Sequence, residues 1–387
     1  MKSILALATL AVVLAANQAP HGPAVTVIRV PNGGVQPQVA LDASGTLHLL
    51  YYSGEAAGGD LYYVRSRDEG RSWSAPLRVN SVPGSAIAAG TIRGGEMAIA
   101  KDGQVYVAWN GSSKALPKGP LNPESGNAGE PMLFTRLNPT RSSFEPQRNL
   151  MTHTFGLDGG GTVAADRTGH VYVAWHGKSV GAAQGEAGRQ VWITKSDDDG
   201  KTFAPEHTAW SESTGACACC GMAIFADQQG RVRVLYRSAT DSVHRDIYLL
   251  TSSNSARNFD GRKLAEWNLS ACPMTSMSFA EGAGKEEAAW ETRGQVFFEN
   301  ISQTTAAPVS APAEGKNRKH PRLAISARGE TLMAWTEGTA WGRGGSLVWQ
   351  IYDGQGKPAG GMCRRDDLPA WSFGAVVAAP RGFLLIY

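Results

Sequence analysis

The sequence is dominated by one short segment that recurs seven times along the chain. Each copy has a small or apolar stretch, a turn with glycine, and then alternating β-forming residues; GTVAADRTGHVYVAW, from Gly161, is typical. The turn glycines are Gly45, Gly103, Gly169, Gly230, Gly284, Gly329 and Gly382. In the first six copies an aromatic residue stands six positions after the glycine, and this regularity indicates a repeat architecture.

A second hairpin follows six of these segments, for example VWITKSDDDGKTFAPEH from Val191. The repeating unit therefore holds four strands, and no helical periodicity appears after residue 19. This pattern predicts an all-β propeller built from four-stranded blades, and the repeat count predicts seven of them. Because the last unit lacks a second hairpin, we expect residues 24–31, AVTVIRVP, to complete it beside the C-terminal hairpin.

The first 19 residues resemble a secretory signal peptide. Lys2 is followed by uncharged, mostly apolar residues from Ile4 to Ala16, and small residues come next. We therefore expect export to a periplasm or to the outside of the cell, with residues 20–387 forming a single propeller domain. The 37 basic and 34 acidic side chains give a net charge of +3, which is too even to indicate nucleic acid or an anionic membrane as a partner. No later apolar run is long enough to span a membrane.

Two of the second hairpins carry a motif that resembles the Asp box of sialidases and related propellers. The matching residues are Ser66, Asp68, Gly70 and Trp73 in one copy and Ser196, Asp198, Gly200 and Phe203 in the other. In such a turn the Asp accepts backbone N–H bonds, glycine allows positive φ and the aromatic residue packs beneath the hairpin. The motif is structural. The resemblance implies a sialidase-like propeller with six blades, one fewer than the repeat count predicts.

The resemblance also implies an exo-glycosidase that acts on acidic, sialic-acid-type glycans. That chemistry needs three arginines for the sugar carboxylate, a Tyr nucleophile activated by Glu, and an acidic general acid. Sialidases carry the first arginine in an R-I-P triplet of the first blade, but the corresponding triplet here begins with Val35. Arg29 belongs to a similar triplet that falls too early, and Arg93 occupies the right level one blade later.

Strand alternation places the starts of the inner strands, and the loops after the second strands, on the face opposite the Asp boxes. Propellers usually bind ligands in the funnel of that face, here a carbohydrate or small molecule. The candidate catalytic residues there are Arg93, Glu96, Asp158, Arg237, Arg245 and Arg322. The candidate substrate-binding residues are His153, His176, Lys319 and His320. The alternative interpretation of these groups is solvated loop charges and strand-end ion pairs.

Cysteines gather before two consecutive inner strands. Cys217, Cys219 and Cys220 precede the fourth, and Cys272 with Met274 precedes the fifth, so we expect them to form one cluster. In an exported protein such cysteines form disulfides, with Cys363 as a further partner. Alternatively, thiolates and thioethers form a soft-metal site, which would select copper(I) or zinc as cofactor. A catalytic thiol is a third interpretation.

Two classes of function follow from these patterns. One is an exported sialidase-like glycosidase. The other is a non-catalytic propeller that binds a glycan, a protein or a soft metal at the Cys/Met cluster, because the propeller fold alone hosts many functions.

Overall fold

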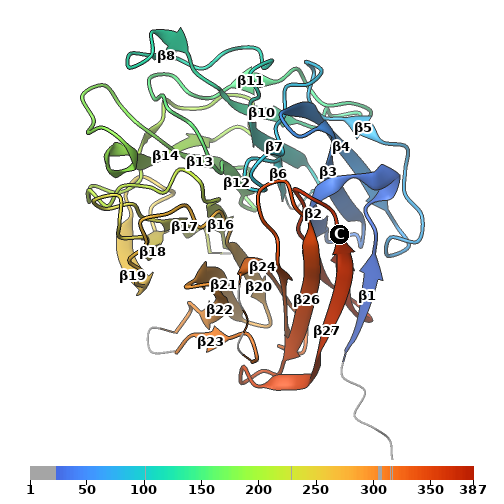
Figure 1. The fold of residues 1–387 in the computed structure, drawn as a ribbon. Helices are drawn as coiled ribbons and strands as arrows, with labels where there is room; N and C mark the ends of the chain where they lie inside the picture. The colour runs from blue at the N-terminus through green and yellow to red at the C-terminus, as the bar shows by residue number, and fades with distance from the viewer. Residues whose placement is uncertain (1–22, 101, 228, 304–306, 314, 316) are drawn as a thin grey trace, which may run out of the picture.

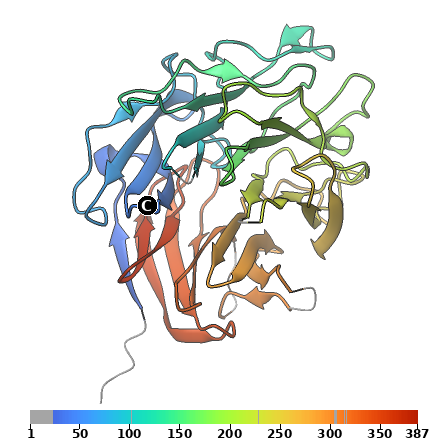
Figure 2. The same ribbon diagram turned by 180° about the vertical axis from the view of Figure 1, so that it is seen from behind.

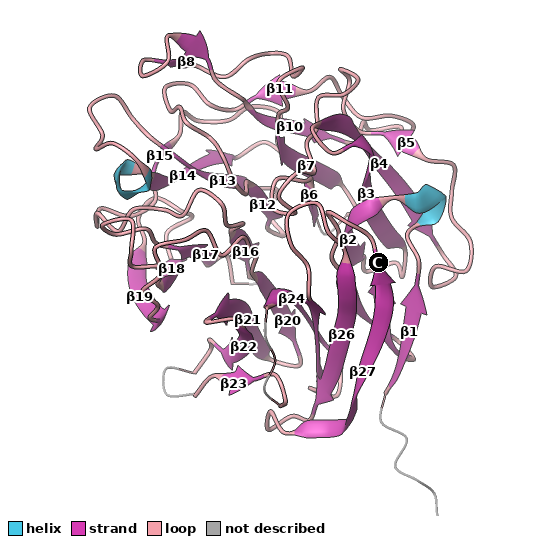
Figure 3. Ribbon diagram, in the orientation of Figure 1, coloured by secondary structure: helices cyan, strands magenta, loops and turns pink. Residues whose placement is uncertain are grey.

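The computed structural model describes residues 23–387, apart from residues 101, 228, 304–306, 314 and 316. The expected signal segment, residues 1–19, lies outside the described residues. Regular structure is almost entirely strand, with two single 3-10 turns, η1 (Pro31–Gly33) and η2 (Glu186–Gly188) (Figure 3). In the described part of the chain, no helix is long and apolar enough to cross a membrane.

Six blades are four-stranded sheets. Each follows the chain from its inner strand outward. The first three blades are β2 (Val35–Leu41), β3 (Leu47–Glu55), β4 (Gly58–Ser66), β5 (Leu77–Arg78); β6 (Glu96–Ile99), β7 (Val105–Asn110), β10 (Met132–Arg136), β11 (Arg148–Asn149); and β12 (Thr162–Ala165), β13 (Val171–Gly177), β14 (Gln190–Ser196), β15 (His207–Thr208). The next three are β16 (Ala223–Ala226), β17 (Val232–Arg237), β18 (Ile247–Ser252), β19 (Asp260–Ala265); β20 (Ser278–Gly282), β21 (Lys285–Thr292), β22 (Gln295–Asn300), β23 (Val309–Ser310); and β24 (Arg318–Ile325), β25 (Thr331–Glu337), β26 (Gly345–Tyr352), β27 (Pro358–Leu368).

The seventh blade is made by both ends of the described chain. β28 (Ala375–Ala379) and β29 (Gly382–Ile386) form its hairpin, and β1 (Ala24–Ile28) pairs with β29 in parallel, from Ala24 opposite Gly382 to Ile28 opposite Ile386. The closing segment thus lies beside the C-terminal hairpin as expected, but it takes the third position instead of the fourth. Because β1 leads into the first blade, it must run in the same direction as the fourth strand of any other blade. In an antiparallel blade the second and fourth strands run in the same direction, so β1 pairs in parallel with β29, the second strand, when the third strand is missing.

The inner strands close into a ring. β2, β6, β12, β16, β20, β24 and β28 each contact the inner strands of both neighbouring blades, and β28 contacts β2. Figures 1 and 2 show the blades arranged around this centre, with β1 beside the C-terminal strands. The predicted all-β propeller is confirmed, and the blade number is seven, not six.

The repeated aromatic residue is a packing residue. Trp109, Trp175, Trp290 and Trp335 are at most 1% exposed. Trp175, for example, lies in one cluster with Ala98 and Phe134 of the preceding blade. Burial of such large side chains between neighbouring sheets stabilises the ring.

The turns between third and fourth strands have the hydrogen bonds that their sequence predicts. The Oδ1 atom of Asp68 accepts bonds from the Ser66 hydroxyl at 2.7 Å and from the Ser72 amide at 2.9 Å, and Gly70 has a φ of 81°. Asp198 accepts the corresponding bonds from Ser196 and Thr202 in the third blade. These hydrogen bonds hold the pKa of Asp68 and of Asp198 at about 2.

Candidate functional site

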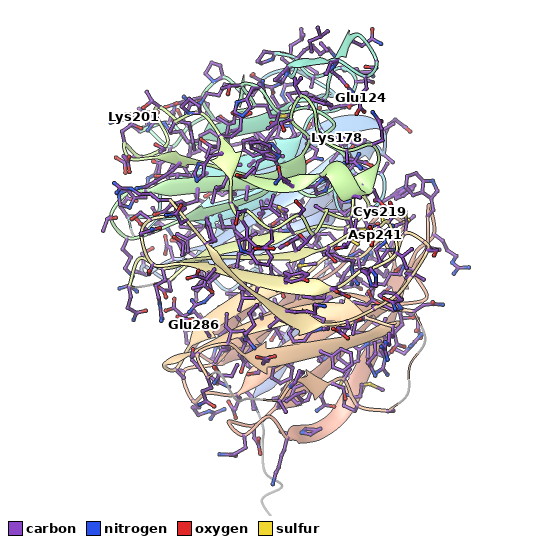
Figure 4. All side chains as sticks on the ribbon, turned by 90° about the vertical axis from the view of Figure 1, so that its left-hand side faces the viewer. Glu124, Lys178, Lys201, Cys219, Asp241 and Glu286 are labelled. Atoms are coloured by element: carbon purple, nitrogen blue, oxygen red, sulfur yellow. The ribbon has the colours of Figure 1, made fainter. Side chains whose placement is uncertain are left out.

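The two faces of the propeller are clearly separated. Figure 4 places Glu124, Lys178, Cys219 and Asp241 on one side of the molecule, and Lys201 and Glu286 on the other. The first four belong to loops before inner strands or after second strands, which identifies that side as the funnel face. Lys178 donates a 2.5 Å hydrogen bond to Glu124, which ties the long loop after β7 to the third blade.

Arg93 and Asp158 meet on the funnel face. They precede the inner strands of the second and third blades. The Arg93 guanidinium forms an ion pair with the Asp158 carboxylate and donates a 2.8 Å bond to the Asp158 carbonyl and a 2.9 Å bond to the Ala89 carbonyl. The Asp158 side chain remains 38% exposed, whereas that of Arg93 is 16% exposed. The carboxylate is therefore the more accessible member of the pair.

A cavity of about 290 Å³ opens beside this pair. We call it the funnel pocket; its lining includes Arg93, Asn110, Glu130, Asp158 and Trp341. Trp341 is 61% exposed, and its ring stands edge-on to that of Trp371 at 4.9 Å between centroids. The pocket thus combines an exposed aromatic surface with two carboxyl groups and an amide.

Arg237 and Arg245 lie buried elsewhere. Arg237 pairs with Glu291 of the fifth blade at 3.0 Å, and Arg245 pairs with Glu186 of the third blade at 2.7 Å. Burial raises the pKa of Glu291 to about 7, although Arg237 and the Gly294 amide oppose that shift. Each guanidinium therefore joins the fourth blade to a neighbour.

Glu96 and Arg322 lie deeper, in a central cavity of about 190 Å³. Arg322 donates to the Ser276 hydroxyl at 3.2 Å and the Met277 carbonyl at 3.1 Å, and its guanidinium lies over the ring of Phe373. Burial raises the pKa of Glu96 to about 7 against the opposing charge of Arg322. This cavity does not share Arg93 or Asp158 with the funnel pocket.

Of the four candidate arginines, Arg93 lines the funnel pocket and Arg322 lines the central cavity. Arg93, Arg237 and Arg245 form ion pairs with carboxylates of neighbouring blades, whereas Arg322 donates to the Ser276 hydroxyl of the fifth blade. The catalytic roles assigned from the sequence stay predictions.

The candidate substrate-binding residues differ in their surroundings. His153 is half exposed and lies 3.6 Å from Glu206, and Lys319 is in β24. His176 is buried, and neither ring nitrogen has a partner among the described residues. Burial lowers its pKa to about 4 and that of His320 to about 3. Both imidazoles are therefore neutral near pH 7.

Three cysteines form a compact cluster before β16. The Sγ atom of Cys217 lies 3.5 Å from that of Cys219 and 3.6 Å from that of Cys220, and the three sulfurs lie within 4.8 Å of one another. Cys272 and Cys363 are exposed, and none of the five cysteines forms a disulfide in the described structure. Cys272 does not belong to this group of possible ligands. The expected four-cysteine cluster is thus reduced to three.

The three thiols have different acidities. Burial disfavours a charge on Cys220, but hydrogen bonds from Cys217 and Cys219 and the charge of Arg237 outweigh it, so its pKa is well below the usual range. The hydrogen bond with Cys219 lowers the pKa of Cys217, but its hydrogen bond with Cys220 and its burial together raise that pKa above the usual range. The pKa of Cys219 is raised by hydrogen bonding with Cys217, then with Cys220, and by burial.

Comparison of the sequence with family models and with curated proteins finds no match. Solved structures do match. A protein of unknown function from Dyadobacter fermentans is 14% identical, with a TM-score of 0.53, over 81% of this chain and 93% of its own. A Hadza microbial sialidase is 14% identical (TM-score 0.52; 82% of this chain, 65% of its own), and the Trypanosoma rangeli sialidase is 11% identical (TM-score 0.52; 79% and 53%).

The chain shares the β-propeller fold with these sialidases, which confirms the resemblance drawn from the Asp boxes at the level of architecture. The blade number departs from what that resemblance implies, since this chain has seven blades and not six. The chain spans about two thirds of the first sialidase and about half of the second.

Sequence reasoning missed several residues of the funnel face. Trp341, Glu130 and Asn110 line the funnel pocket, and Glu186 anchors the cysteine loop. Their signal in the sequence is position: Asn110, Glu130 and Trp341 stand in or next to loops that follow second strands. Nothing in the sequence alone shows which of these loops meet.

Proposed function

We propose that the protein is a carbohydrate-binding propeller whose ligand occupies the funnel pocket. The observation that carries the proposal is the exposed ring of Trp341 in the same cavity as the Asp158 carboxylate. Sugars present apolar C–H faces and hydroxyl groups, and aromatic rings with a few placed polar groups recognise both. The fold shared with sialidases supports the choice of carbohydrate by analogy.

The charge of the pocket favours a neutral sugar. The lining holds one guanidinium, from Arg93, and two carboxyl groups, from Asp158 and Glu130, and the guanidinium is already paired with Asp158. An acidic sugar would have to displace Asp158 from Arg93, which leaves a carboxylate without its partner. The acidic glycan that the sialidase resemblance implies therefore becomes the competing ligand in the test.

Hydrolysis is a second candidate function, favoured by the presence of two carboxyl groups in one cavity. Most glycosidases use such a pair, one as acid and one as base or nucleophile. In this proposal Asp158 and Glu130 supply the pair, and Arg93 positions Asp158 through its two hydrogen bonds.

Export is part of the proposal, with residues 1–19 as the signal segment. Expression of the full chain with an added C-terminal tag, followed by N-terminal sequencing of the processed protein, tests this step. A mature chain that still begins at Met1 would contradict it.

A glycan panel tests binding. We expect neutral oligosaccharides to bind the parent, and Trp341→Ala to weaken that binding about tenfold or more because stacking area is lost. Met362→Ala is the control, since Met362 is also an exposed apolar residue of the sixth blade but lies on its outer strand β27. Binding of sialosides alone would overturn the neutral-sugar assignment, and equal affinity of parent and Trp341→Ala would remove the pocket from recognition.

Fluorogenic glycosides test hydrolysis. Asp158→Asn and Glu130→Gln should each retain glycan binding while turnover falls by a factor of about 100 or more. If the parent binds sugars but releases no aglycone from neutral glycosides, α-sialosides or uronides, hydrolysis is contradicted and the protein is a non-catalytic carbohydrate-binding propeller.

A further inference from the structure

The three-cysteine cluster lies in a turn that neighbouring segments hold in place. Cys217 donates its amide to the Arg237 carbonyl at 2.9 Å, and Cys220 donates to the Cys217 carbonyl at 3.3 Å. The Ala218 amide between them donates to the Glu186 carboxylate of the third blade at 2.8 Å. The sulfurs are therefore brought together by backbone contacts that need no bond between the sulfurs themselves.

The cluster is shielded but reachable. Cys217 and Cys220 are each 2% exposed, whereas Cys219 is partly exposed on the funnel face (Figure 4). An ion could reach the cluster from the side of Cys219. Once bound, it would be shielded from water by the buried Cys217 and Cys220. Buried, preorganised donors of this kind reduce the conformational cost of binding an ion.

Two guanidinium groups act on the cluster electrostatically. The charge of Arg245 interacts with Cys217 and Cys219, and that of Arg237 interacts with Cys220. Both arginines also have carboxylate partners, Glu186 and Glu291. These charges act against the burial that raises the pKa of Cys217 and Cys219, and binding of a metal would release the protons of those thiols.

The number of donors restricts the choice of metal. Among the described residues, the possible ligand group contains three cysteines and no His, Asp or Glu. Structural zinc is almost always four-coordinate, with zinc–sulfur distances of about 2.3 Å that place tetrahedral ligands about 3.8 Å apart. Soft thiolates select copper(I), which accepts three sulfur ligands. The observed sulfur separations of 3.5 and 3.6 Å need to widen by only a few tenths of an ångström.

We propose that Cys217, Cys219 and Cys220 bind one copper(I) ion in a three-sulfur site on the funnel face. The site involves neither Trp341 nor Asp158, so it does not depend on the proposed carbohydrate function. Cys272 takes no part in it, because it is exposed and lies outside the cluster.

Titration of the reduced, full-length protein with copper(I) under anaerobic conditions tests the proposal, with a chromogenic copper(I) chelator as competitor. We expect one equivalent to bind, and X-ray absorption to show three sulfur neighbours at about 2.3 Å. Cys219→Ser should weaken binding about 100-fold or more, since loss of outer contacts alone already costs 10–100-fold. Cys272→Ser is the matched control and should bind as the parent does.

Three results would overturn the proposal. The first is that the reduced parent does not bind one equivalent of copper(I). This result counts in the same way if two of the three sulfurs were joined as a disulfide before the protein was reduced. The second is an equal loss of affinity in Cys272→Ser. The third is a four-coordinate zinc spectrum with zinc outcompeting copper(I). Near-ultraviolet circular dichroism establishes whether Cys219→Ser is folded. The X-ray absorption measurement uses the parent protein, so it tests the proposal even if that variant does not fold.

Discussion

Arg237 donates a 3.0 Å hydrogen bond from its guanidinium to the carboxylate of Glu291, across the boundary between the fourth and fifth blades. The side chains are 0% and 2% exposed. The sequence presents Arg237 as a funnel arginine that could grip a substrate, yet its charge is committed to the neighbouring blade. The pair is a structural connection between blades, and this leads to the first prediction.

Removal of one partner should destabilise the protein strongly. Arg237→Met and Glu291→Leu should each lower the free energy of unfolding by about 3 kcal/mol at pH 8, because each leaves a buried group without its partner. The loss of unfolding free energy in the double variant should be smaller than the sum of the two single losses by at least about 2 kcal/mol. Denaturant unfolding measures the cycle, and additive losses would contradict the structural pairing. The exposed Arg381–Glu69 pair is the control, and Arg381→Met should cause no measurable change.

Two loop glycines with positive φ should respond differently to alanine. Gly215 has a φ of 62° and Gly185 a φ of 72°, and both belong to funnel-face loops. An added Cβ at Gly215 would lie 2.9 Å from backbone atoms of Ala239, whereas at Gly185 it meets nothing within 4 Å. We expect Gly185→Ala to cost about 1–3 kcal/mol for its backbone conformation alone, because φ 72° with ψ −159° is a combination that only glycine adopts readily. Gly215→Ala should cost about 1–3 kcal/mol for the overlap with Ala239 in addition to its own backbone strain. Equal losses in thermal or chemical unfolding would show that the close approach to Ala239 is absent.

Tyr387 should contribute strongly to closure of the ring. It is 3% exposed, packs with Val25 and Val27 of β1, and its hydroxyl accepts a 2.9 Å bond from Arg365. Tyr387→Ala should cost about 3–5 kcal/mol, and Tyr387→Phe, which retains the ring, only about 1 kcal/mol. Chemical denaturation distinguishes these values; similar losses in both variants would mean that the hydroxyl, not the packing, carries the contribution.

Buried neutral histidine predicts a loss of stability in acid. The unfolded chain protonates His320 as pH falls below about 6.5, whereas the folded chain does not until about pH 3. The unfolded state therefore binds the extra proton in this window, and stability falls as pH falls, by up to about 1.4 kcal/mol per pH unit for this group.

His320→Asn should reduce that dependence. Asparagine tolerates the φ of 53° found at this position, so the backbone need not change. Unfolding measured at pH 5 and pH 6 should show a slope smaller than that of the parent by about 1 kcal/mol per pH unit. An unchanged slope would indicate that His320 is protonated in the folded chain. His176, whose pKa is also lowered, should maintain part of the dependence in the variant.

The turns of the first hairpins also follow a local pattern in the sequence. Asp42, Asp166 and Asp227 each stand three residues before a turn glycine. Each caps its hairpin, as where Asp42 accepts the amides of Ser44 and Thr46 at 2.9 Å. Such bonds are made within a few residues of one chain segment, and for that reason their pattern is visible in the sequence.

The sequence by itself determined the repeat, the strand periodicity, the Asp-box turns and the closing segment at 24–31, because each depends on local backbone preference or on alternation of apolar residues. Tertiary structure alone decided the position of that segment in its blade, and the pairing of Arg93, Arg237 and Arg245 with carboxylates of adjacent blades. It also decided that Cys272 stays apart from the other three cysteines. Those outcomes depend on which loops meet across blade boundaries. They could not be predicted, because the spacing of residues along the chain does not show which loops of different blades lie close together.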